Sequence, residues 1–187
     1  MVIAAMLLSV EAAATAVHAG NIIAYPTEAI YGLGCDPDNQ TSLQQLLEIK
    51  ARATNKGLIL VGSEWQQLEP FVELTNQSIL DRALESWPGP VTWIMPASDR
   101  CSALLTGGRK TIAVRVSAHT VVRDLCNEYG NALVSTSANI SGEAPLRQAE
   151  EVADAFASQI AGVVEGKLGG LENATSIFDA TTGVQLR

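Results

Sequence analysis

Basic residues are scarce in this sequence. The 187-residue chain has 12 Lys and Arg against 20 Asp and Glu, which gives a formal net charge of −8. A protein of this charge that binds long stretches of nucleic acid would need a strongly local basic patch to overcome its own repulsive field. The composition therefore disfavours extended nucleic-acid binding. It also makes any cluster of cations along the chain informative.

Cysteine and histidine are few as well. The three cysteines, Cys35, Cys101 and Cys126, are widely spaced and form no CxxC pair. They suit a reducing compartment better than a disulfide framework or a zinc site. The two histidines, His18 and His119, form no metal-binding pattern with carboxylates or cysteines. We expect a cytoplasmic protein without a metal site built by its own side chains.

Long apolar runs are absent. No segment reaches the roughly 20 residues that a membrane-spanning helix needs. The start of the chain is apolar, as a secretory signal is, but it lacks basic residues and Glu11 interrupts it. The pattern instead predicts an amphipathic helix with Ser9 as the N-cap and Gly20 just beyond its end. The buried face of this helix would consist of Val10, Ala13, Ala14 and Val17.

Several signature motifs are also missing. The chain has no GxGxxG after its first strand and no GxxxxGKS/T, so a Rossmann or P-loop nucleotide site is not expected. It has no GxSxG elbow and no HExxH, so neither a serine hydrolase nor a metallopeptidase is supported. Because there is no internal repeat and no low-complexity linker, residues 1–187 are predicted to form one domain.

Short strand-like apolar runs alternate with helical segments along the chain. With 47% hydrophobic residues, the chain has enough apolar material for one core. Strands are predicted at residues 21–25, 58–62, 91–96, 111–116, 132–135, 160–164 and 175–180. Further helices are predicted at 78–87, 120–129, 148–158 and 41–50, the last with a capping box from Thr41 to Gln44. Strands interspersed with helices indicate an α/β fold.

The segment AYPTEAIYGLGCD, residues 24–36, follows the first predicted strand. Pro26 cannot continue a central strand, and the two glycines permit a close or left-handed backbone. We therefore expect Thr27 and Glu28 to lie on a turn at the strand end, where open α/β sheets bind ligands. The alternative is a plain Pro/Gly turn with the two tyrosines packed beneath it.

The segment KARATNKGL, residues 50–58, concentrates three of the twelve cations within seven positions. Lys50 ends a predicted helix, where the helix dipole favours a cation, but Arg52 and Lys56 have no such structural reason. A guanidinium with flanking ammonium groups suits a polyphosphate or a carboxylate. A solvated loop is the alternative that composition leaves open.

Two further segments carry polar groups next to apolar strands. In TIAVRVSAH, strand alternation puts Arg115 on the face opposite the three large apolar side chains, so its role depends on whether that face holds a ligand. In ALVSTSANISG, residues 132–142, hydroxyls and backbone N–H groups beyond the strand could wrap phosphate oxygens. An ordinary Ser/Thr-rich turn is the alternative for this segment.

Taken together and in this order, these segments resemble the YrdC-like family in its short bacterial form. The matching stretches are AYPTEAIYGLGCDP, KARATNKGLIL, SWPGPVTW, LTGG followed by IAVRV, and LVSTSANISG. They cover residues 21–145, and the similarity continues weakly into TSIFDATTG. Any one of these motifs is common, whereas all of them in register make accidental similarity improbable.

The resemblance implies a fold and a reaction. The fold is a single α/β domain with an open, twisted, mixed sheet, flanking helices and a basic concave face. The reaction converts L-threonine, bicarbonate or CO2, and ATP into threonylcarbamoyl-adenylate and pyrophosphate, with Mg²⁺ bound to the phosphates. The product would feed formation of N6-threonylcarbamoyladenosine in tRNA. A partner transferase would make that final transfer, and this chain would contact tRNA weakly at most.

The resemblance also implies roles for particular residues. The catalytic group, which would neutralise the triphosphate and the departing pyrophosphate, consists of Lys50, Arg52 and Lys56. The residues expected to hold or approach threonine are Thr27, Arg115, Ser135, Ser176 and Tyr25. Those expected to approach ATP, besides the basic group, are Thr111, Ser137 and Asn139.

One position departs from the family pattern. Ala53 stands where the family usually has proline, directly after the arginine of the basic loop. Because proline restricts both itself and the preceding residue, we expect this loop to be more mobile before a ligand binds. The charges of the loop are retained, so the expected reaction is unchanged.

Two other functions are carried as alternatives. The first is a module that binds structured RNA or tRNA without catalysis, which the acidic composition opposes. The second is adenylation of a carbamoyl group taken from carbamoyl phosphate, as in the YrdC-like part of hydrogenase-maturation proteins. Those proteins are much longer and carry zinc-finger and acylphosphatase parts that 187 residues do not contain.

Overall fold

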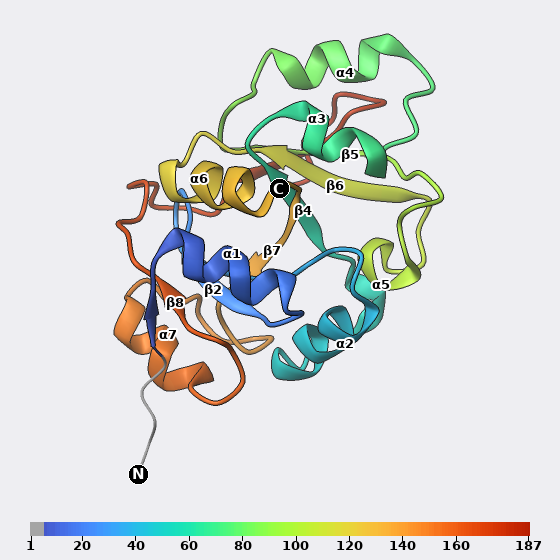
Figure 1. Ribbon diagram of the computed structural model, residues 1–187. Coiled ribbons are helices and arrows are strands. Elements are labelled where there is room, and N and C mark those ends of the chain that lie inside the picture. Colours follow the sequence, from blue (N-terminus) through green and yellow to red (C-terminus); the bar gives the residue numbers. More distant parts are fainter. Residues whose placement is uncertain (1–5) are drawn as a thin grey trace.

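Short strands form one open, mixed sheet in the computed structural model, which describes residues 6–187 (Figure 1). The nine strands of these residues are ordered β1-β8-β2-β3-β7-β4-β6-β5-β9. Their bounds are β1 (Leu7–Leu8), β2 (Ile23–Pro26), β3 (Tyr31–Gly34), β4 (Ile59–Gly62), β5 (Val91–Pro96), β6 (Thr111–Val116), β7 (Leu133–Ser137), β8 (Val163–Val164) and β9 (Ser176–Asp179). The predicted open α/β sheet is confirmed.

Every predicted strand appears in the sheet, and two further strands were not predicted. The strand β1 has only two residues, too few to show a period. The strand β3 was interpreted as a turn because it contains two glycines, but it forms an antiparallel hairpin with β2. Pro26 was expected to lie beyond the ladder, and this was wrong, because it pairs with Tyr31 as the last residue of β2. Since β8 pairs with β2 only at Ala24, the proline is not required to donate to that neighbour.

The glycines of β3 serve close packing rather than a left-handed turn. Neither Gly32 nor Gly34 is among the residues with positive φ. A Cβ atom on Gly34 would lie 2.4 Å from the backbone oxygen of Val134 and 2.7 Å from the ring of Tyr25. At Gly32 the nearest atoms would be 3.4 Å away, which is ordinary contact. Gly34 therefore lets β3 pack beneath the tyrosine, whereas at Gly32 a methyl group would meet the Thr136 oxygen and the Thr27 side chain without overlap.

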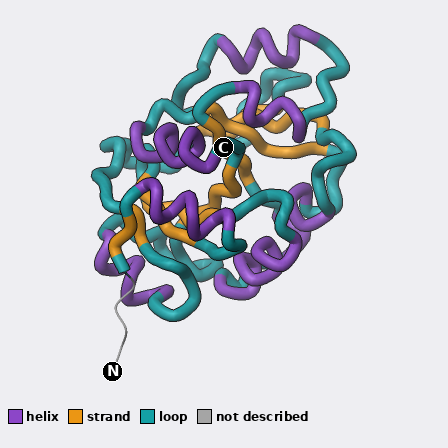
Figure 2. The backbone as a smooth tube through the Cα atoms, in the orientation of Figure 1, coloured by secondary structure: helices purple, strands orange, loops and turns teal. Residues whose placement is uncertain are grey.

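Helices and helical turns flank the sheet on both sides (Figure 2). Their bounds are α1 (Val10–His18), α2 (Gln40–Ile49), η1 (Thr54–Lys56), α3 (Trp65–Leu68), η2 (Glu69–Phe71), α4 (Gln77–Leu84), α5 (Ala103–Thr106), α6 (Thr120–Tyr129) and α7 (Ala149–Phe156). Within the described part of the chain, none of them is long and apolar enough to cross a lipid bilayer.

The predicted start of α1 is confirmed, and that of α2 is corrected. The Ser9 hydroxyl accepts the Ala12 N–H at 3.2 Å as the N-cap of α1, and Gly20 follows the helix with φ of 82°. In α2 the cap is Asn39, whose side chain accepts the Ser42 N–H at 3.0 Å. Thr41 lies within the first turn instead, because the amide side chain two residues earlier already satisfies the free N–H group.

The two faces of the sheet are covered differently. One face packs against α2, α3, α4, α5 and α7, which contribute Leu43, Leu46, Leu68, Ile79, Leu105 and Phe156 to the larger apolar cluster. The other face packs against α1 and α6, which lie side by side in front of the sheet in Figure 1. These two helices contribute Ala13, Ala14, Val17, Val122, Leu125 and Cys126. Two helices cannot cover the whole face, so its remaining part opens into a cavity.

Candidate active site

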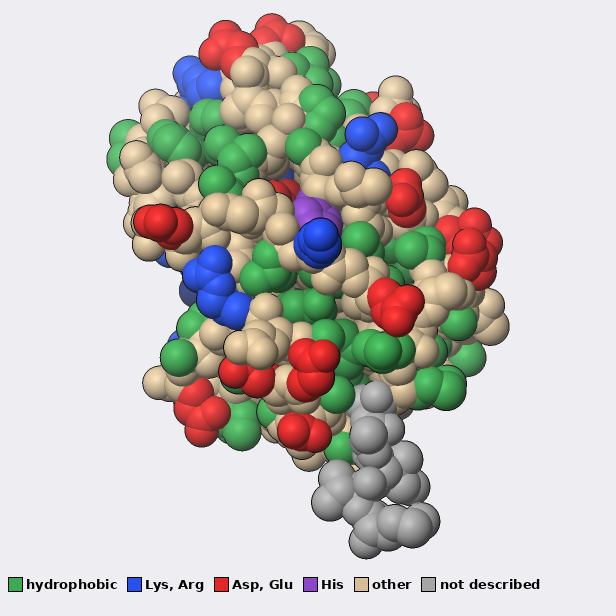
Figure 3. Space-filling view, turned by 90° about the vertical axis from the view of Figure 1, so that its left-hand side faces the viewer, with side chains coloured by type: hydrophobic (Ala, Val, Ile, Leu, Met, Phe, Trp, Pro, Cys, Tyr) green, Lys and Arg blue, Asp and Glu red, His purple; other side chains and the backbone are tan. Residues whose placement is uncertain are grey.

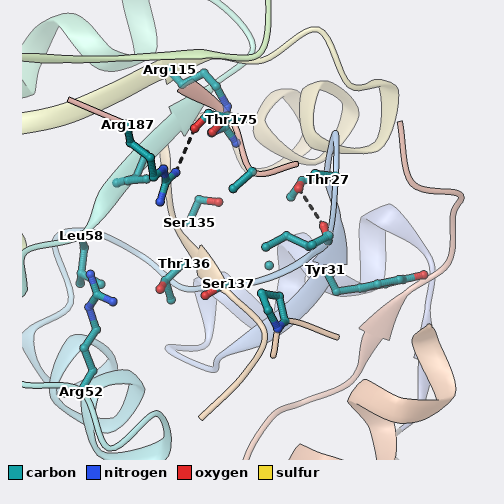
Figure 4. A pocket seen from close by; sticks show the side chains of 16 residues that line it. Thr27, Tyr31, Arg52, Leu58, Arg115, Ser135, Thr136, Ser137, Thr175 and Arg187 are labelled. Carbon is teal, nitrogen blue, oxygen red and sulfur yellow. Dashed lines mark hydrogen bonds between the residues drawn. The ribbon is translucent and has the colours of Figure 1, made fainter. Parts of the chain in front are cut away.

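The cavity has a volume of about 190 Å³ and lies over the central strands β3, β7, β4 and β6 (Figure 4). Segments far apart in the sequence line it. Its walls are formed by Thr27, Ala29, Ile30, Tyr31, Gly32, Arg52, Leu58, Ile59, Arg115, Ser135, Thr136, Ser137, Pro145, Ala174, Thr175 and Arg187. Five of the residues expected to bind substrates are among them, namely Thr27, Arg52, Arg115, Ser135 and Ser137.

Strand register brings these residues onto one face. Gly32 of β3 pairs with Ser137 of β7, and Ser135 of β7 pairs with Ile59 of β4. Residues two apart on a strand share a face, and directly paired residues do so as well. Arg115 of β6 pairs with Val61, two residues beyond Ile59, and therefore lies on this face too. The expected alternation of the arginine strand is thus confirmed, and its polar face is the one that borders the cavity.

Arg115 is buried in the cavity wall, with 4% of its surface exposed. Its Nη1 donates to the hydroxyls of Thr92 at 3.2 Å and Thr175 at 3.1 Å. Its Nη2 lies 3.3 Å from the Oε2 of Glu28, a residue of the turn between β2 and β3. The Nε–H has no hydrogen-bond partner among the described residues. Arg115 is therefore a charged, fixed group with an unused donor.

Arg52 reaches the cavity from the loop that follows α2. Ala51 takes a left-handed backbone with φ of 47°, which turns the chain at the helix end. The Arg52 Nη2 then donates to the backbone oxygen of Gly57 at 2.9 Å, while its buried Nε finds no partner in the described chain. Burial and the neighbouring Arg109 lower the pKa of Arg52. A guanidinium in this position would be stabilised by an anion.

Ala53, the position where the family usually has proline, has φ of −60° and ψ of 132°. Proline fixes φ near about −65°. The alanine backbone thus takes a conformation that proline would also adopt, so the path of the basic loop does not depend on the proline. The mobility of the loop before a ligand binds depends on the range of conformations it takes, which a single conformation does not report. The expected greater mobility therefore stays a prediction.

Lys50 supports the cavity from behind instead of lining it. Its side chain is 1% exposed. Its Nζ donates to the backbone oxygens of Ser137 and Asn139, at 2.7 Å for the latter. Its own backbone oxygen accepts the Ser141 N–H at 2.8 Å. Burial, and secondarily Arg52, lowers the pKa of Lys50 to about 8. Lys50 thereby ties the end of α2 to the hydroxyl-rich turn after β7.

Asn139 shapes the turn after β7 through its side chain. Its Nδ2 donates to the backbone oxygens of Ile140 at 2.9 Å and Glu143 at 2.8 Å. Its Oδ1 is buried and has no hydrogen-bond partner among residues 6–187. Asn139 follows the lining residue Ser137 by two positions, but it is not itself part of the cavity lining.

The other expected site residues also lie outside the cavity lining. Tyr25 is fully buried under α1 and α6, and its hydroxyl donates to the Val134 oxygen at 2.9 Å. Burial raises the pKa of this hydroxyl. Lys56 is exposed on η1, and Thr111 and Ser176 begin β6 and β9 at partly exposed positions. The cavity lining instead includes Thr175, the residue before Ser176.

Among the lining residues that sequence reasoning did not predict, Thr175 and Arg187 carry polar groups that contact one another or Arg115. Arg187 borders the cavity because the last residues of the sequence fold back along β9, with the Leu186 N–H donating to the Ile177 oxygen at 2.7 Å. The Nη2 of Arg187 donates to the Thr175 oxygen at 3.0 Å. Burial, and then proximity to Arg115, lowers the pKa of Arg187. No local sequence pattern indicates these residues as part of the site, because they reach the cavity only where the chain folds back along β9.

The cavity is electrostatically prepared for an anion. Three guanidinium groups border it, and none of the described residues in its lining is acidic. Charges of one sign in a partly desolvated space repel, so bound phosphate or carboxylate groups would relieve them. The lining offers hydroxyls and guanidinium groups but no carboxylate ligands for Mg²⁺. A magnesium ion therefore fits here only as part of a nucleotide complex, with phosphates and water as its ligands.

Comparison with known proteins identifies the family. The model of the Sua5/YciO/YrdC family, described as "Telomere recombination", matches residues 15–187. The chain belongs to this Sua5/YciO/YrdC family. The resemblance seen in the sequence motifs is thereby confirmed.

Curated relatives of this Sua5/YciO/YrdC chain match it over nearly its whole length. The threonylcarbamoyl-AMP synthase of Vibrio vulnificus (strain YJ016) is 47% identical over 184 residues, covering 97% of this chain and 99% of the relative. The threonylcarbamoyl-AMP synthase of Xylella fastidiosa (strain M12) is 46% identical over 185 residues, covering 98% of this chain and 99% of the relative.

Solved structures of the family share the fold. Sua5 of P. abyssi complexed with L-threonine superposes with a TM-score of 0.86 at 30% identity, covering 92% of this chain and 51% of that one. This Sua5/YciO/YrdC chain thus spans about half the length of that protein. E. coli YciO superposes with a TM-score of 0.76 at 23% identity, covering 91% of this chain and 82% of that one, and supports the fold alone.

Proposed function

We propose that this chain is a threonylcarbamoyl-AMP synthase, which converts L-threonine, bicarbonate or CO2, and ATP into threonylcarbamoyl-AMP and pyrophosphate. The observation that carries the proposal is the convergence of Arg52, Arg115 and the hydroxyls of β7 on one cavity. Nearly full-length relatives with this activity in their name, at 47% and 46% identity, support the same conclusion. A solved relative was complexed with L-threonine, which supports the choice of amino acid.

Threonine binds, in this proposal, at the Arg115 end of the cavity. The unused Nε–H of Arg115 donates to the threonine carboxylate, for which a guanidinium is a geometrically matched partner. The hydroxyls of Thr27 and Ser135 border the same space and orient the amino acid. Thr175, which is hydrogen-bonded to Arg115, takes the position on this side that Ser176 was expected to occupy.

ATP binds with its phosphates toward Arg52. The Arg52 guanidinium borders the cavity, and burial lowers its pKa, so a polyanion compensates its charge. Ser137 offers a hydroxyl on the same wall. Arg187, whose Nη2 donates to the Thr175 oxygen, lies at the Arg115 end of the cavity. Lys50 contributes by fixing the turn that carries Ser137, and the exposed Lys56 contributes to the attractive field at longer range. Asn139, two residues after Ser137, and Thr111, at the start of β6, are proposed to approach the nucleotide although neither lines the cavity.

The chemistry is a displacement at phosphorus. The threonine amine first adds to CO2 and loses a proton, or condenses with bicarbonate and releases water, which gives the carbamate. An oxygen of this carbamate then forms a bond to the α-phosphorus of ATP, and the bond from that phosphorus to the bridging oxygen of pyrophosphate breaks. This reaction needs alignment and neutralisation of charge more than a protein nucleophile. Arginines on two sides of the cavity meet these needs. Mg²⁺, bound to the phosphates, supplies further charge neutralisation when it accompanies ATP.

The proposal is tested by incubating the chain with ATP, L-threonine and bicarbonate and measuring pyrophosphate and the adenylate product. We expect pyrophosphate to appear only when threonine is present. Omission of threonine is the control, and carbamoyl phosphate in place of threonine and bicarbonate tests the competing carbamoyl transfer. If pyrophosphate does not depend on threonine, the proposal is wrong.

The chemical nature of the product indicates which process uses it. We propose that threonylcarbamoyl-AMP is handed to transferase proteins that modify tRNA in the cytoplasm. Direct binding of RNA by this chain is weak at most in this proposal, because the formal net charge of −8 opposes a polyanion. On the one face that Figure 3 displays, Lys and Arg side chains form small groups among scattered acidic ones. Salt-sensitive binding of tRNA without ATP and threonine would instead favour an RNA-binding module.

A further inference from the structure

Glu28 is a buried acid with no evident role in the reaction as described so far. Its residue is 6% exposed, and it does not border the cavity that holds the proposed substrates. Burying a carboxylate is costly unless the charge is paired and hydrogen-bonded. An acid at this position therefore has to be explained by what its two oxygens contact.

Each oxygen of Glu28 has a different neighbour. The Oε1 accepts a hydrogen bond from the Ser117 hydroxyl at 2.6 Å. The Oε2 lies 3.3 Å from Nη2 of Arg115, and no hydrogen bond to it is formed within the described chain. One oxygen is thus fixed by a neutral donor, while the other faces the buried guanidinium.

Ser117 is itself oriented toward Glu28. Its oxygen accepts the backbone N–H of His119 at 3.1 Å, at the start of α6. Because that lone pair is occupied, the hydroxyl proton is directed to the glutamate. The result is a chain of hydrogen bonds from the α6 terminus through Ser117 to Glu28, which ends on the charge of Arg115.

The backbone around Glu28 is held as firmly as its side chain. The N–H of Leu171 donates to the Glu28 oxygen at 3.0 Å, and the N–H of Gly169 donates to the Thr27 oxygen at 3.0 Å. A Cβ atom on Gly169 would lie 2.9 Å from the Cα of Glu28, so the loop packs directly on the turn. The carboxylate consequently has little freedom to leave Arg115.

We infer that Glu28 is a positioning residue for the amino acid substrate. It fixes the position of Arg115, together with Thr92 and Thr175, so that the guanidinium presents its free Nε–H to the carboxylate of threonine. This inference rests on the proposed function. Because Glu28 does not border the cavity, it acts through Arg115 and does not touch the substrate.

The inference predicts unequal changes in the KM values for threonine and ATP. Loss of the Glu28 charge should disturb the threonine site, where Arg115 lies, more than the phosphate site near Arg52. A residue that merely stabilised the fold would affect both substrates alike or neither. The ratio of the two KM changes therefore separates positioning from general stability.

The test is Glu28→Gln, which keeps the size of the side chain and an oxygen for Ser117 but removes the charge. Pyrophosphate release is measured with threonine varied at saturating ATP, and then with ATP varied at saturating threonine. We expect KM for threonine to rise about tenfold or more and KM for ATP to change less than about twofold. Glu73→Gln, which removes an exposed carboxylate away from the cavity, is the matched control and should leave both values unchanged.

A second variant and a double-mutant cycle keep the result decisive. Ser117→Ala removes the hydrogen bond that orients Glu28 and should raise KM for threonine in the same direction by a smaller factor. In an Arg115→Lys background, Glu28→Gln should have little additional effect, because both changes act on one interaction. Thermal unfolding of each variant verifies that it is folded.

Three outcomes would overturn the inference. They are an unchanged KM for threonine in Glu28→Gln and Ser117→Ala, equal rises in KM for both substrates, or additive effects of Glu28→Gln and Arg115→Lys. Failure of the proposed function itself has a different signature, since the unmodified chain would then release no threonine-dependent pyrophosphate.

Discussion

The Nζ atom of Lys50 lies 2.7 Å from the backbone oxygen of Asn139, although 89 positions separate the two residues in the sequence. This contact joins the basic loop after α2 to the hydroxyl-rich turn after β7. The two motifs therefore meet at one site, and the lysine stabilises the meeting point rather than offering its charge to the cavity directly. Several consequences of this arrangement can be measured.

The pH dependence of stability reports on the buried ammonium of Lys50. Its pKa is lowered from 10.5 to about 8 by burial and by Arg52. Between these pH values the unfolded chain binds the proton and the folded chain does not, so this group makes the fold more stable as the pH rises through this range. The free energy of unfolding relative to Lys50→Met should increase by on the order of 1 kcal/mol per pH unit.

Urea unfolding of both proteins at pH 7, 8.5 and 10 would measure this difference. Taking the difference removes the titration of groups that the two proteins share. A difference that stays constant with pH would mean that Lys50 titrates normally in the folded state.

The role of Arg52 can be separated from folding. Arg52→Ala removes a guanidinium that borders the cavity and whose Nε lacks a partner among the described residues. Pyrophosphate release should fall by about two orders of magnitude, as for the loss of a charge that stabilises a transition state, with little change in thermal unfolding. Arg123→Ala, which removes an exposed arginine from α6, should have normal turnover. Unchanged turnover in Arg52→Ala would remove this residue from the mechanism.

Arg187 is expected to act on threonine rather than on ATP. Its guanidinium borders the cavity and donates to the backbone oxygen of Thr175, whose hydroxyl accepts from Arg115. Arg187→Ala should raise KM for threonine about tenfold, the effect of one charge-assisted hydrogen bond, and leave KM for ATP within about twofold. The kinetic comparison with Arg123→Ala distinguishes this from a loss of general positive charge. A larger effect on ATP would contradict the placement of Arg187 at the threonine end.

The two glycines of β3 should respond in opposite ways to the same substitution. Gly32→Ala adds a methyl group at ordinary contact distance on the cavity side, so the protein should fold normally but bind substrate poorly. Gly34→Ala places the methyl group 2.4 Å from the Val134 oxygen, and overpacking of this kind costs about 1–3 kcal/mol or more.

Thermal unfolding and pyrophosphate release would be measured on both glycine variants. We expect loss of activity with retained stability for Gly32→Ala, and loss of stability for Gly34→Ala. Normal activity of Gly32→Ala would show that substrates do not use the space between Thr27 and Ser135.

The backbone at the start of the basic loop is strained at one position. Ala51 has φ of 47°, and a left-handed conformation costs a non-glycine residue about 1–2 kcal/mol. Ala51→Gly should therefore stabilise the protein by about 0.5 kcal/mol or more, after the greater freedom of glycine in the unfolded chain is subtracted. Ala53→Gly is the matched control. Because φ of −60° suits alanine, this substitution relieves no strain and should destabilise the protein through the greater freedom of glycine in the unfolded chain. Denaturant unfolding should give effects of opposite sign.

Local patterns in the sequence determined much of the fold. The strands β5 and β6 were predicted residue for residue, and the Ser9 cap and Gly20 end of α1 follow from short-range hydrogen bonding and backbone freedom. The face of Arg115 follows from a period of two. These features depend on neighbours a few positions apart, so the sequence displays them directly. The family motifs likewise identified Thr27, Arg52, Ser135 and Ser137, which all border the cavity.

Only the tertiary structure decided which side chains face the cavity and which support it. Tyr25 and Lys50 were expected at the substrates, but both are buried and bonded to backbone oxygens of β7 and its turn. Glu28 pairs with Arg115, and Arg187 reaches the cavity through the return of the chain along β9. Burial and strand register depend on contacts between distant segments, and a linear pattern of residue types does not encode those contacts locally.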